Sequence, residues 1–336
     1  MTPDAGPLLT DLLRQVSRSF YQTLRILPGA VRRQIGLAYL LARATDTIAD
    51  TELIPVELRL DALRFLRGRI LGLHSKPLDF GSLAQQQGSS AERVLLERVE
   101  EALGLLSSFP EADQKLIRGV LQTILGGQEL DLTRFTSASV TRIVALATDA
   151  DLDAYTYCVA GCVGEFWTKL CRVHLFPNAP LDDARQLADG VRFGKGLQLV
   201  NILRDLPADL RQGRCYIPAP RLESIGLKPA DLLERDAEPR FRQLYHAYLD
   251  QAAEHLAAGW NYTNAVPGSC IRVRLACAWP ILIGVRTLAR LRVENVLEAE
   301  RRIKISRAEV RGLVFRSVLR YPFSGPWRRL FSLAAA

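Results

Sequence analysis

Two pairs of aspartates with the same spacing are the side chains of this sequence that most clearly indicate chemistry. Asp46 and Asp50 lie in DTIAD, and Asp205 and Asp209 lie in DLPAD. On a helix, residues four apart share one face, so each pair brings two like charges together and costs stability. Mg²⁺ offsets such charges, because it binds one or two carboxylates and leaves its other positions to water and substrate phosphates. Two such sites facing each other across a cavity would hold diphosphate groups.

The first pair follows an apolar stretch, which favours a buried helix over a solvated acidic face. Leu40, Leu41 and Ile48 flank the acids, and buried charges need partners. Arg43 precedes Asp46 by three residues and would share its helical face. Its guanidinium can offset part of the repulsion and can grip a phosphate with two parallel hydrogen bonds. The alternative is an exposed ion pair on a charged surface.

The second pair continues a polar stripe along an otherwise apolar segment. Gln198, Asn201, Asp205 and Asp209 follow the spacing of one helical face. The positions between them are mostly Leu, Ile and Val, so the stripe must face a polar cavity or a partner. Pro207 stands between the two aspartates and is expected to bend or end the helix there.

A third run, YTYCVAGCVGEFW, combines tyrosine hydroxyls with small residues. Gly161 and Gly164 on a helix would permit the close approach of another helix or of a ligand. Both interpretations stay open. Tyr155 and Tyr157 would place their hydroxyls beside an apolar wall.

Helical periodicity dominates the chain, and strand patterns are almost absent. The ranges predicted to be helical are 8–16, 35–48, 91–106, 113–130, 139–148, 153–173, 181–206, 229–233, 240–265, 271–293 and 306–321. Segment 75–88 is rich in polar residues, Pro and Gly, and is predicted to be a flexible loop. The pattern predicts an all-α bundle with long central helices.

Composition is that of a globular protein with a large core. The chain has 336 residues, of which 48% are hydrophobic, and it contains no long linker, which favours one domain over residues 1–336. Its six cysteines form no CxxC pair and are expected to be reduced, mostly buried thiols of a cytosolic protein. The longest apolar stretch, 275–285, is too short to span a bilayer.

The net charge is +8, and the basic excess lies late in the chain. Such a patch attracts nucleic acid, anionic lipid or phosphorylated substrates. No nucleic-acid motif accompanies it, so we expect no nucleic-acid partner. Segment 306–336 mixes arginines with Leu, Val, Phe and Trp. It is either an interfacial helix that contacts a membrane or a packing helix with an arginine-rich solvent face.

Taken together, SRSF, DTIAD, YTYCVAGCVG and LVNILRDLPADLRQGRCYIP resemble the motifs of the squalene/phytoene synthase family. They occur in the family's order over residues 17–218, whereas the last third of the chain matches only as a basic helical segment. The resemblance implies a single-domain, all-α isoprenoid-synthase fold with a central active-site cavity. It also implies a prenyltransferase that joins two prenyl diphosphates head to head.

The resemblance assigns roles residue by residue. Asp46 and Asp50 would bind Mg²⁺ and diphosphate at a first site. Asp205, Asp209 and Asn201 would do so at a second, and all four aspartates would serve catalysis. Tyr155, four residues before VAG, falls on the family's catalytic tyrosine. The side chains expected to contact substrate are Ser17, Ser19, Phe20, Tyr39, Arg43, Gln198, Asn201, Arg204 and Tyr216.

Thr47 carries the prediction of the product. Many phytoene and dehydrosqualene synthases have an acid there, whereas this chain has the DT start of squalene synthases. The resemblance therefore implies a squalene synthase that joins two farnesyl diphosphates through presqualene diphosphate, with Mg²⁺ and with reduction by NADPH. The alternative is a phytoene, dehydrosqualene or presqualene diphosphate synthase, which omits the reduction.

The NADPH site has no motif to place it, because the chain has no GxGxxG fingerprint. Lys195, Lys304 and Arg307 are basic side chains considered for it. A non-catalytic relative that binds prenyl chains is disfavoured, because both aspartate pairs are intact. We expect a cytoplasmic monomer, either free or peripheral on the membrane face.

Overall fold

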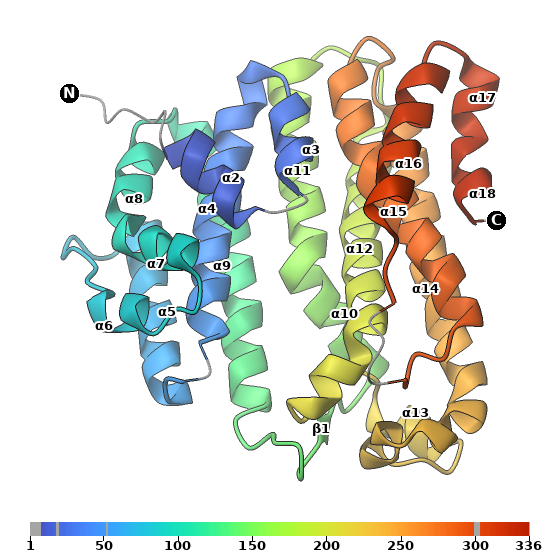
Figure 1. The fold of residues 1–336 in the computed structure, drawn as a ribbon. Helices are drawn as coiled ribbons and strands as arrows, with labels where there is room; N and C mark the ends of the chain where they lie inside the picture. The colour runs from blue at the N-terminus through green and yellow to red at the C-terminus, as the bar shows by residue number, and fades with distance from the viewer. Residues whose placement is uncertain (1–7, 18–19, 52, 299–302, 336) are drawn as a thin grey trace. The chain divides into compact units, whose positions relative to one another are not determined.

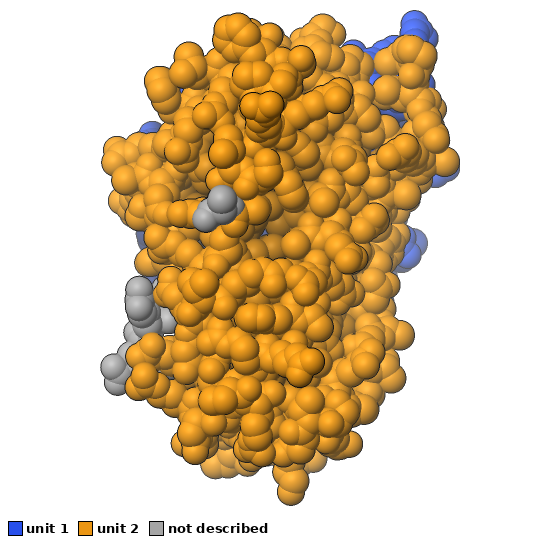
Figure 2. All heavy atoms as spheres, turned by 90° about the vertical axis from the view of Figure 1, so that its right-hand side faces the viewer, with its two compact units in different colours: residues 1–136, 166–178 blue, residues 137–165, 179–336 orange. Residues whose placement is uncertain are grey.

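The computed structural model of the protein describes residues 8–17, 20–51, 53–298 and 303–335. These residues are mostly helical, which confirms the all-α prediction (Figure 1). The described strands are β1 (Val144–Ala145) and β2 (Arg214–Cys215), which pair in parallel. The chain divides into two compact units, coloured separately in Figure 2: unit 1 is 1–136 with 166–178, and unit 2 is 137–165 with 179–336. The single domain over 1–336 stays a prediction.

Unit 1 is built on three long helices, α4, α5 and α9, which pack against one another (Figure 1). A buried carboxylate ties the unit together: Asp113 on α9 is 2% exposed. It accepts a hydrogen bond from Gln34 on α4 at 3.0 Å and contacts His174 on α11 at 2.7 Å. The elements of the unit are η1 (Leu8–Leu12), α2 (Leu13–Val16), α3 (Phe20–Ile26), α4 (Gly29–Ala49), α5 (Val56–Leu71), α6 (Gly81–Gln85), α7 (Ser90–Glu97), α8 (Val99–Ser107), α9 (Glu111–Arg134) and the C-terminal part of α11 (Cys162–Leu175).

Unit 2 is built around α12, which packs against α14, α15 and the π-helical turn η2. Two contacts of α12 are unusually close: a Cβ on Gly194 would lie 2.0 Å from the carbonyl oxygen of Ala160 in η2, and one on Gly164 at the start of α11 would lie 1.9 Å from the carbonyl oxygen of Gly190. The small residues of the third run therefore serve close helix packing. The elements are α10 (Asp149–Thr156), η2 (Tyr157–Gly161), the start of α11, α12 (Asp183–Arg211), α13 (Ala219–Glu223), η3 (Pro229–Leu233), η4 (Arg235–Ala237), α14 (Glu238–Ala265), α15 (Ile271–Val293), α16 (Arg307–Arg320), α17 (Ser324–Arg328) and α18 (Leu330–Ala335).

The predicted end of α12 at residue 206 is wrong in the structure, where the helix continues past Pro207 to Arg211. A proline lacks the N–H that would bond the carbonyl four residues earlier, which here belongs to Leu203. The buried hydroxyl of Tyr245 on α14 donates to that carbonyl at 3.0 Å. The lost backbone hydrogen bond is thus replaced from a neighbouring helix, so the second aspartate pair stays on one continuous helix.

The helix predicted over 139–148 is also wrong. Ser139 and Arg142 form an isolated antiparallel bridge, and β1 follows them. β-Branched residues are frequent in this stretch, and they favour extended backbone. Thr148 then caps α10, where its side chain and that of Asp151 form a capping box.

Three further differences concern unit 1. The helix predicted over 91–106 is interrupted at Arg98, which separates α7 from α8. Helix α5 was not predicted, although Leu63, Leu66 and Ile70 are fully buried at helical spacing. Exposed apolar side chains on the same helix, such as Leu58 at 57%, obscure the periodicity. The predicted loop over 75–88 contains the short helix α6.

Among the described residues, no helix is both long and apolar enough to cross a membrane. The cysteines are free thiols, and four of the six are buried. Both observations agree with the predictions from composition.

Candidate active site

The first aspartate pair lies at the C-terminal end of α4 in unit 1. Asp50 is the C-cap residue, and its N–H donates to the carbonyl of Asp46 at 2.8 Å. Ala44 and Ile48 are fully buried on the same turns, so the acids stand on a mostly buried helix, as predicted. Asp50 is exposed, and the side chain of Asp46 is 45% exposed. Both carboxylates are therefore accessible to a ligand.

Asp46 has one close neutral donor and one more distant cation. Nε2 of Gln128 on α9 donates to Oδ1 of Asp46 at 2.6 Å. Nη1 of Arg43 lies 3.9 Å from Oδ2, while Nη2 of the same arginine is hydrogen-bonded to Glu92 on α7. Although the carboxylate is partly accessible, desolvation by the protein around it and then the charge of Asp50 raise the pKa of Asp46 to about 7. The repulsion within the pair is only partly offset, which favours a bound cation.

The end of α4 is held by side chains from other helices. Nη1 of Arg59 on α5, which is 6% exposed, donates to the carbonyl of Ala49 at 2.7 Å. A cation at this end satisfies a free carbonyl and interacts favourably with the helix dipole. Thr51 donates to the carbonyl of Thr47 at 2.6 Å and accepts from Gln87 at 2.7 Å.

A hollow of about 250 Å³ adjoins the first pair within unit 1. Thr47 reaches it from a nearly buried position, at 3% exposed, and its hydroxyl donates to the carbonyl of Arg43 at 2.8 Å. Polar side chains dominate its lining, which includes Arg43, Thr47, Asp50, Thr51, Gln87 and Glu92.

The other residues predicted for the first site are partly described. Ser17, just after α2, is 2% exposed. Tyr39 on α4 is half-buried. Ser19 and the side chain of Phe20 lie outside the described residues. The buried polar atoms of the described part of this unit that have no hydrogen-bond partner include Oγ of Ser17, Nε of Arg43 and Oε1 of Gln128. Buried groups of this kind are normally satisfied by a partner, water or an ion. Arg43 and Gln128 both adjoin Asp46, so their free atoms fit a polar ligand beside the pair.

The second pair lies on α12 in unit 2, and the predicted stripe is present. Leu199, Leu203 and Leu206 are buried, whereas the four polar positions are half-buried or exposed. Nδ2 of Asn201 donates to Oε1 of Gln198 at 3.5 Å. The guanidinium of Arg204, predicted to contact diphosphate, makes a two-point contact with its neighbour Asp205 at 3.0 and 2.5 Å.

Tyr155 is stacked on Tyr216, with ring centroids 4.7 Å apart. Tyr216 is 5% exposed, so it acts as a wall for the ring of Tyr155. Tyr157 points its hydroxyl elsewhere and donates to Glu165 at 2.9 Å, an interaction that raises the pKa of Tyr157 to about 12. Tyr157 is thereby held as a neutral donor. The adjacent π-helical turn is a feature often found at functional sites.

Of the residues considered for NADPH, Lys195 is engaged within unit 2. Its Nζ contacts both carboxylate oxygens of Asp153, at 2.7 and 2.8 Å. Lys304 and Arg307 are exposed at the start of α16. Among the described residues, these contacts assign no site for NADPH.

Sequence reasoning missed Gln128, Glu92 and Arg59, which come from three different helices. Gln128 carried a signal, because it follows Leu121 and Leu125 on a buried helical face, where a polar side chain needs a partner. Glu92 and Arg59 had no signal in their local sequence. Their roles depend on how α5 and α7 pack against α4.

The acid pairs fit Mg²⁺ better than a metal held by protein alone. Among the described residues, no three His, Cys, Asp or Glu side chains gather into a metal-binding group. Mg²⁺ does not require one, since it takes one or two carboxylates together with water and substrate phosphates. Asp46 and Asp50 would hold it in unit 1. Asp205 and Asp209, with Asn201, would hold it in unit 2.

The fold places the protein in a known structural class. Its helices match a solved structure of TcSQS with the ligand E5700 at a TM-score of 0.80, over 99% of this chain and 91% of that one, at 23% identity. The model of the squalene/phytoene synthase family matches residues 13–309. The chain belongs to this family.

Relatives within the family differ in activity. A bifunctional lycopene cyclase/phytoene synthase of Blakeslea trispora is 32% identical over 62% of this chain and 32% of its own length. A squalene synthase of Saccharomyces cerevisiae is 26% identical over 83% of this chain and 60% of its own length. The chain thus spans less than two thirds of the length of these curated relatives.

Proposed function

We propose that the protein is a Mg²⁺-dependent squalene synthase, which joins two farnesyl diphosphates head to head and reduces the product with NADPH. The observation that carries the proposal is the pair of acid sites, each on a buried helix with its own polar support. Asp46 has Gln128, and Asp205 has Arg204. Membership of the squalene/phytoene synthase family supports a head-to-head condensation.

The proposed chemistry begins with the loss of diphosphate, a poor leaving group until its charge is neutralised. Mg²⁺, when bound, supplies that neutralisation as charge develops. Arg43 and Arg204 can add to it, because each guanidinium adjoins an acid pair. Each would exchange its present carboxylate partner for a phosphate oxygen when substrate binds.

The allylic cation that remains must be protected from water and directed to the second prenyl chain. The stacked rings of Tyr155 and Tyr216 can face a cation without reacting, and each ring contributes about 0.5–2 kcal/mol. Attack by the double bond of the second prenyl chain, with loss of one proton, gives presqualene diphosphate. The hydroxyl of Tyr155 or the departing diphosphate would accept that proton. A second ionisation and rearrangement would give a cation that NADPH, when bound, would reduce by supplying hydride.

Thr47 supports squalene as the product. The residue is 3% exposed, and its hydroxyl donates to the carbonyl of Arg43. A carboxylate at this position could not donate that hydrogen bond and would be nearly buried between Arg43 and Asp50. The similarity to a phytoene synthase of Blakeslea trispora favours the second candidate, a phytoene- or dehydrosqualene-type enzyme that omits the reduction.

Product analysis separates the two candidates. Purified protein would be incubated with Mg²⁺ and either the C15 or the C20 prenyl diphosphate, with and without NADPH. We expect turnover of the C15 substrate, squalene only when NADPH is present, and presqualene diphosphate or dehydrosqualene without it. A product that is the same with and without NADPH would replace the squalene assignment with the phytoene type.

A further inference from the structure

The outer side of α16, in unit 2, exposes a row of large apolar side chains. Phe315 is 67% exposed, Val318 50% and Leu319 61%, and Phe323, just beyond the helix, is 61% exposed. Their spacing of three or four residues places the first three on one helical face. We call these four side chains the α16 face.

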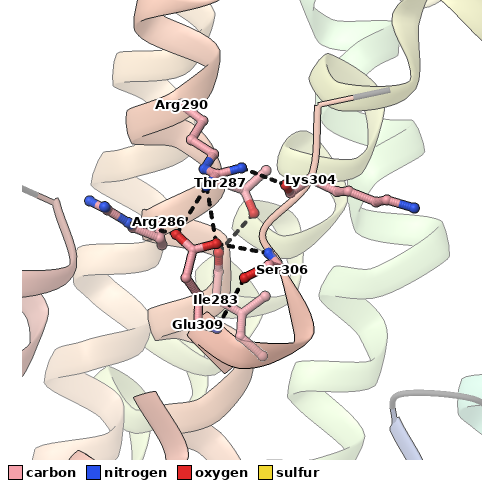
Figure 3. Close-up of polar contacts among 7 residues, drawn as sticks. All are labelled: Ile283, Arg286, Thr287, Arg290, Lys304, Ser306 and Glu309. Atoms are coloured by element: carbon pink, nitrogen blue, oxygen red, sulfur yellow. Dashed lines mark hydrogen bonds and ion pairs between the residues drawn. The ribbon is translucent and has the colours of Figure 1, made fainter. Parts of the chain in front are cut away.

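The inner side of α16 is firmly attached, so this exposure does not result from a loosely packed helix. Figure 3 shows its N-terminal anchor: Glu309 forms a capping box with Ser306 and contacts Arg290 at 3.0 Å and Arg286 at 3.8 Å. Further along, Ser317 is fully buried and accepts a hydrogen bond from Trp279 on α15 at 2.9 Å. The orientation of α16 is therefore fixed with the apolar row outward.

The surroundings of the α16 face are basic. The sequence contains no Asp or Glu after Glu309, but it contains five arginines there: Arg311, Arg316, Arg320, Arg328 and Arg329. Within the described residues, none of these five guanidinium groups forms an ion pair. The arginines elsewhere in unit 2 are often paired, as Arg292 is with Asp250. The local positive charge is thus uncompensated by the acidic side chains that the structure describes.

We propose that the α16 face, together with Arg311, Arg316 and Arg320, binds the surface of an anionic lipid bilayer. A helix lies in such an interface when its apolar side enters the boundary of the acyl chains and its cationic side chains meet the headgroups. Nucleic acid would satisfy the arginines and leave the phenylalanines in water. The proposal does not depend on the proposed function, although a hydrocarbon product would need a bilayer to leave into.

Sedimentation with vesicles tests the proposal, because it uses the full chain and no substrate. We expect the protein to pellet with phosphatidylcholine vesicles that contain phosphatidylglycerol, and to stay in solution with phosphatidylcholine alone. Phe315→Ser combined with Leu319→Ser should weaken the binding by about tenfold or more, since each side chain loses the transfer free energy of a large apolar group. Arg311→Gln combined with Arg316→Gln should weaken it by about fivefold for each charge.

Matched variants exclude general effects of charge and hydrophobicity. Leu58→Ser with Leu73→Ser removes two apolar side chains that are 57% and 71% exposed in unit 1. Arg64→Gln with Arg240→Gln removes two exposed arginines elsewhere. Both controls should pellet like the wild type, and all variants should keep its melting temperature. The proposal is overturned if the wild type ignores anionic vesicles, or if the α16 variants bind as it does. It is also overturned if light scattering shows a dimer that the Phe315 and Leu319 changes dissociate, because a second copy would then cover this face.

Discussion

At the scale of residues, the carboxylate of Asp46 is the most finely balanced group of the first acid pair. Desolvation and the charge of Asp50 raise its pKa, whereas Arg43 and the hydrogen bond from Gln128 lower it. A proton and Mg²⁺ compete for the same oxygens, because a carboxylate must be ionised to bind the metal. Gln128 therefore affects Mg²⁺ binding by lowering the pKa of Asp46.

This competition predicts a pH-dependent requirement for Mg²⁺. Below the pKa of about 7, the Mg²⁺ concentration for half-maximal activity should rise, by about tenfold per pH unit for one competing proton. Gln128→Leu removes a hydrogen bond that lowers this pKa, so the rise should begin at a higher pH. Mg²⁺ titrations at several pH values, with wild type and variant side by side, measure the shift.

The control for that variant is another buried glutamine with the same kind of partner. Gln34 donates to the carboxylate of Asp113 at 3.0 Å, twelve residues before Asp46 on α4. Gln34→Leu should lower the melting temperature and leave the pH dependence of the Mg²⁺ requirement unchanged. The same pH profile for Gln128→Leu and wild type would contradict the role assigned to Gln128.

In the metal-free protein, Asp46 makes the stability of the fold decrease as the pH rises, whereas Mg²⁺ binding improves as the pH rises. The raised pKa means that folded Asp46 binds its proton more tightly than the unfolded chain does. Its contribution to stability is therefore complete at pH values below the ordinary aspartate pKa, and it is lost as the pH rises toward 7. A comparison of thermal melting with and without Mg²⁺ would separate the two effects.

Sequence reasoning at this scale succeeds within a helix and fails between helices. The four-residue spacing correctly placed Asp46, Asp50 and Arg43 together, because helix geometry alone fixes neighbours along one face. Arg59 caps the same helix from α5, but no spacing relates a residue to a carbonyl on another helix. Such contacts depend on packing, which local periodicity does not determine.

At the scale of elements, one of the closest contacts in unit 2 is between η2 and α12. Gly194→Ala would place a Cβ 2.0 Å from the carbonyl oxygen of Ala160, which is backbone and cannot move aside alone. We expect a loss of about 3 kcal/mol or more, since overpacking at a rigid contact forces the helices apart. The Gln198–Asn201 stripe lies on α12, and Tyr155 lies on α10, which directly precedes η2, so activity should fall with stability. Urea unfolding measures the change.

Gly126 on α9 provides the control, because a Cβ there would meet no atom within 4 Å. Gly126→Ala should stabilise the protein by about 0.4–1 kcal/mol, through the reduced entropy of the unfolded chain. An equal, small effect of both substitutions would show that the contact between η2 and α12 can open without cost.

Pro207 predicts an unusual energetic coupling between α12 and α14. Tyr245→Phe removes the hydroxyl that donates to the carbonyl of Leu203, and an unsatisfied buried carbonyl costs about 1–3 kcal/mol. Pro207→Ala restores the backbone donor, so Tyr245→Phe should cost less in that background. A double-mutant cycle on the free energy of unfolding measures this coupling. Additive effects would mean that the tyrosine does not replace the missing N–H.

The elements also show which sequence signals were sufficient to predict a helix and its ends. The range 271–293 coincides with α15, whose apolar periodicity is long and uninterrupted. Pro207 misled the prediction of a helix end, because the rule for proline considers only the helix that contains it. Helix α5 was missed because the exposed side chains of Leu58 and Phe65 add apolar signal on its solvent side. In each case, the error comes from a tertiary contact or exposure that overrides the local pattern.

At the scale of the whole molecule, each compact unit contains one aspartate pair: Asp46 and Asp50 in unit 1, and Asp205 and Asp209 in unit 2. Under the proposed function, each pair needs diphosphate as well as Mg²⁺, because the protein supplies too few ligands to complete the coordination. Binding to the folded state alone raises the free energy of unfolding. Ligand-induced stabilisation is therefore a test of both pairs that requires no turnover.

We expect Mg²⁺ with inorganic diphosphate to raise the melting temperature by about 5 °C, which corresponds to about 2.7 kcal/mol at a ligand concentration about a hundredfold above Kd. Mg²⁺ alone, or diphosphate with a chelator, should change it little. Asp205→Asn with Asp209→Asn should reduce the shift, whereas Asp61→Asn with Asp250→Asn, which removes two exposed aspartates, should preserve it. A full shift in the first variant would exclude the second pair as a diphosphate site. A full shift with Mg²⁺ alone would show that the protein completes the coordination without substrate.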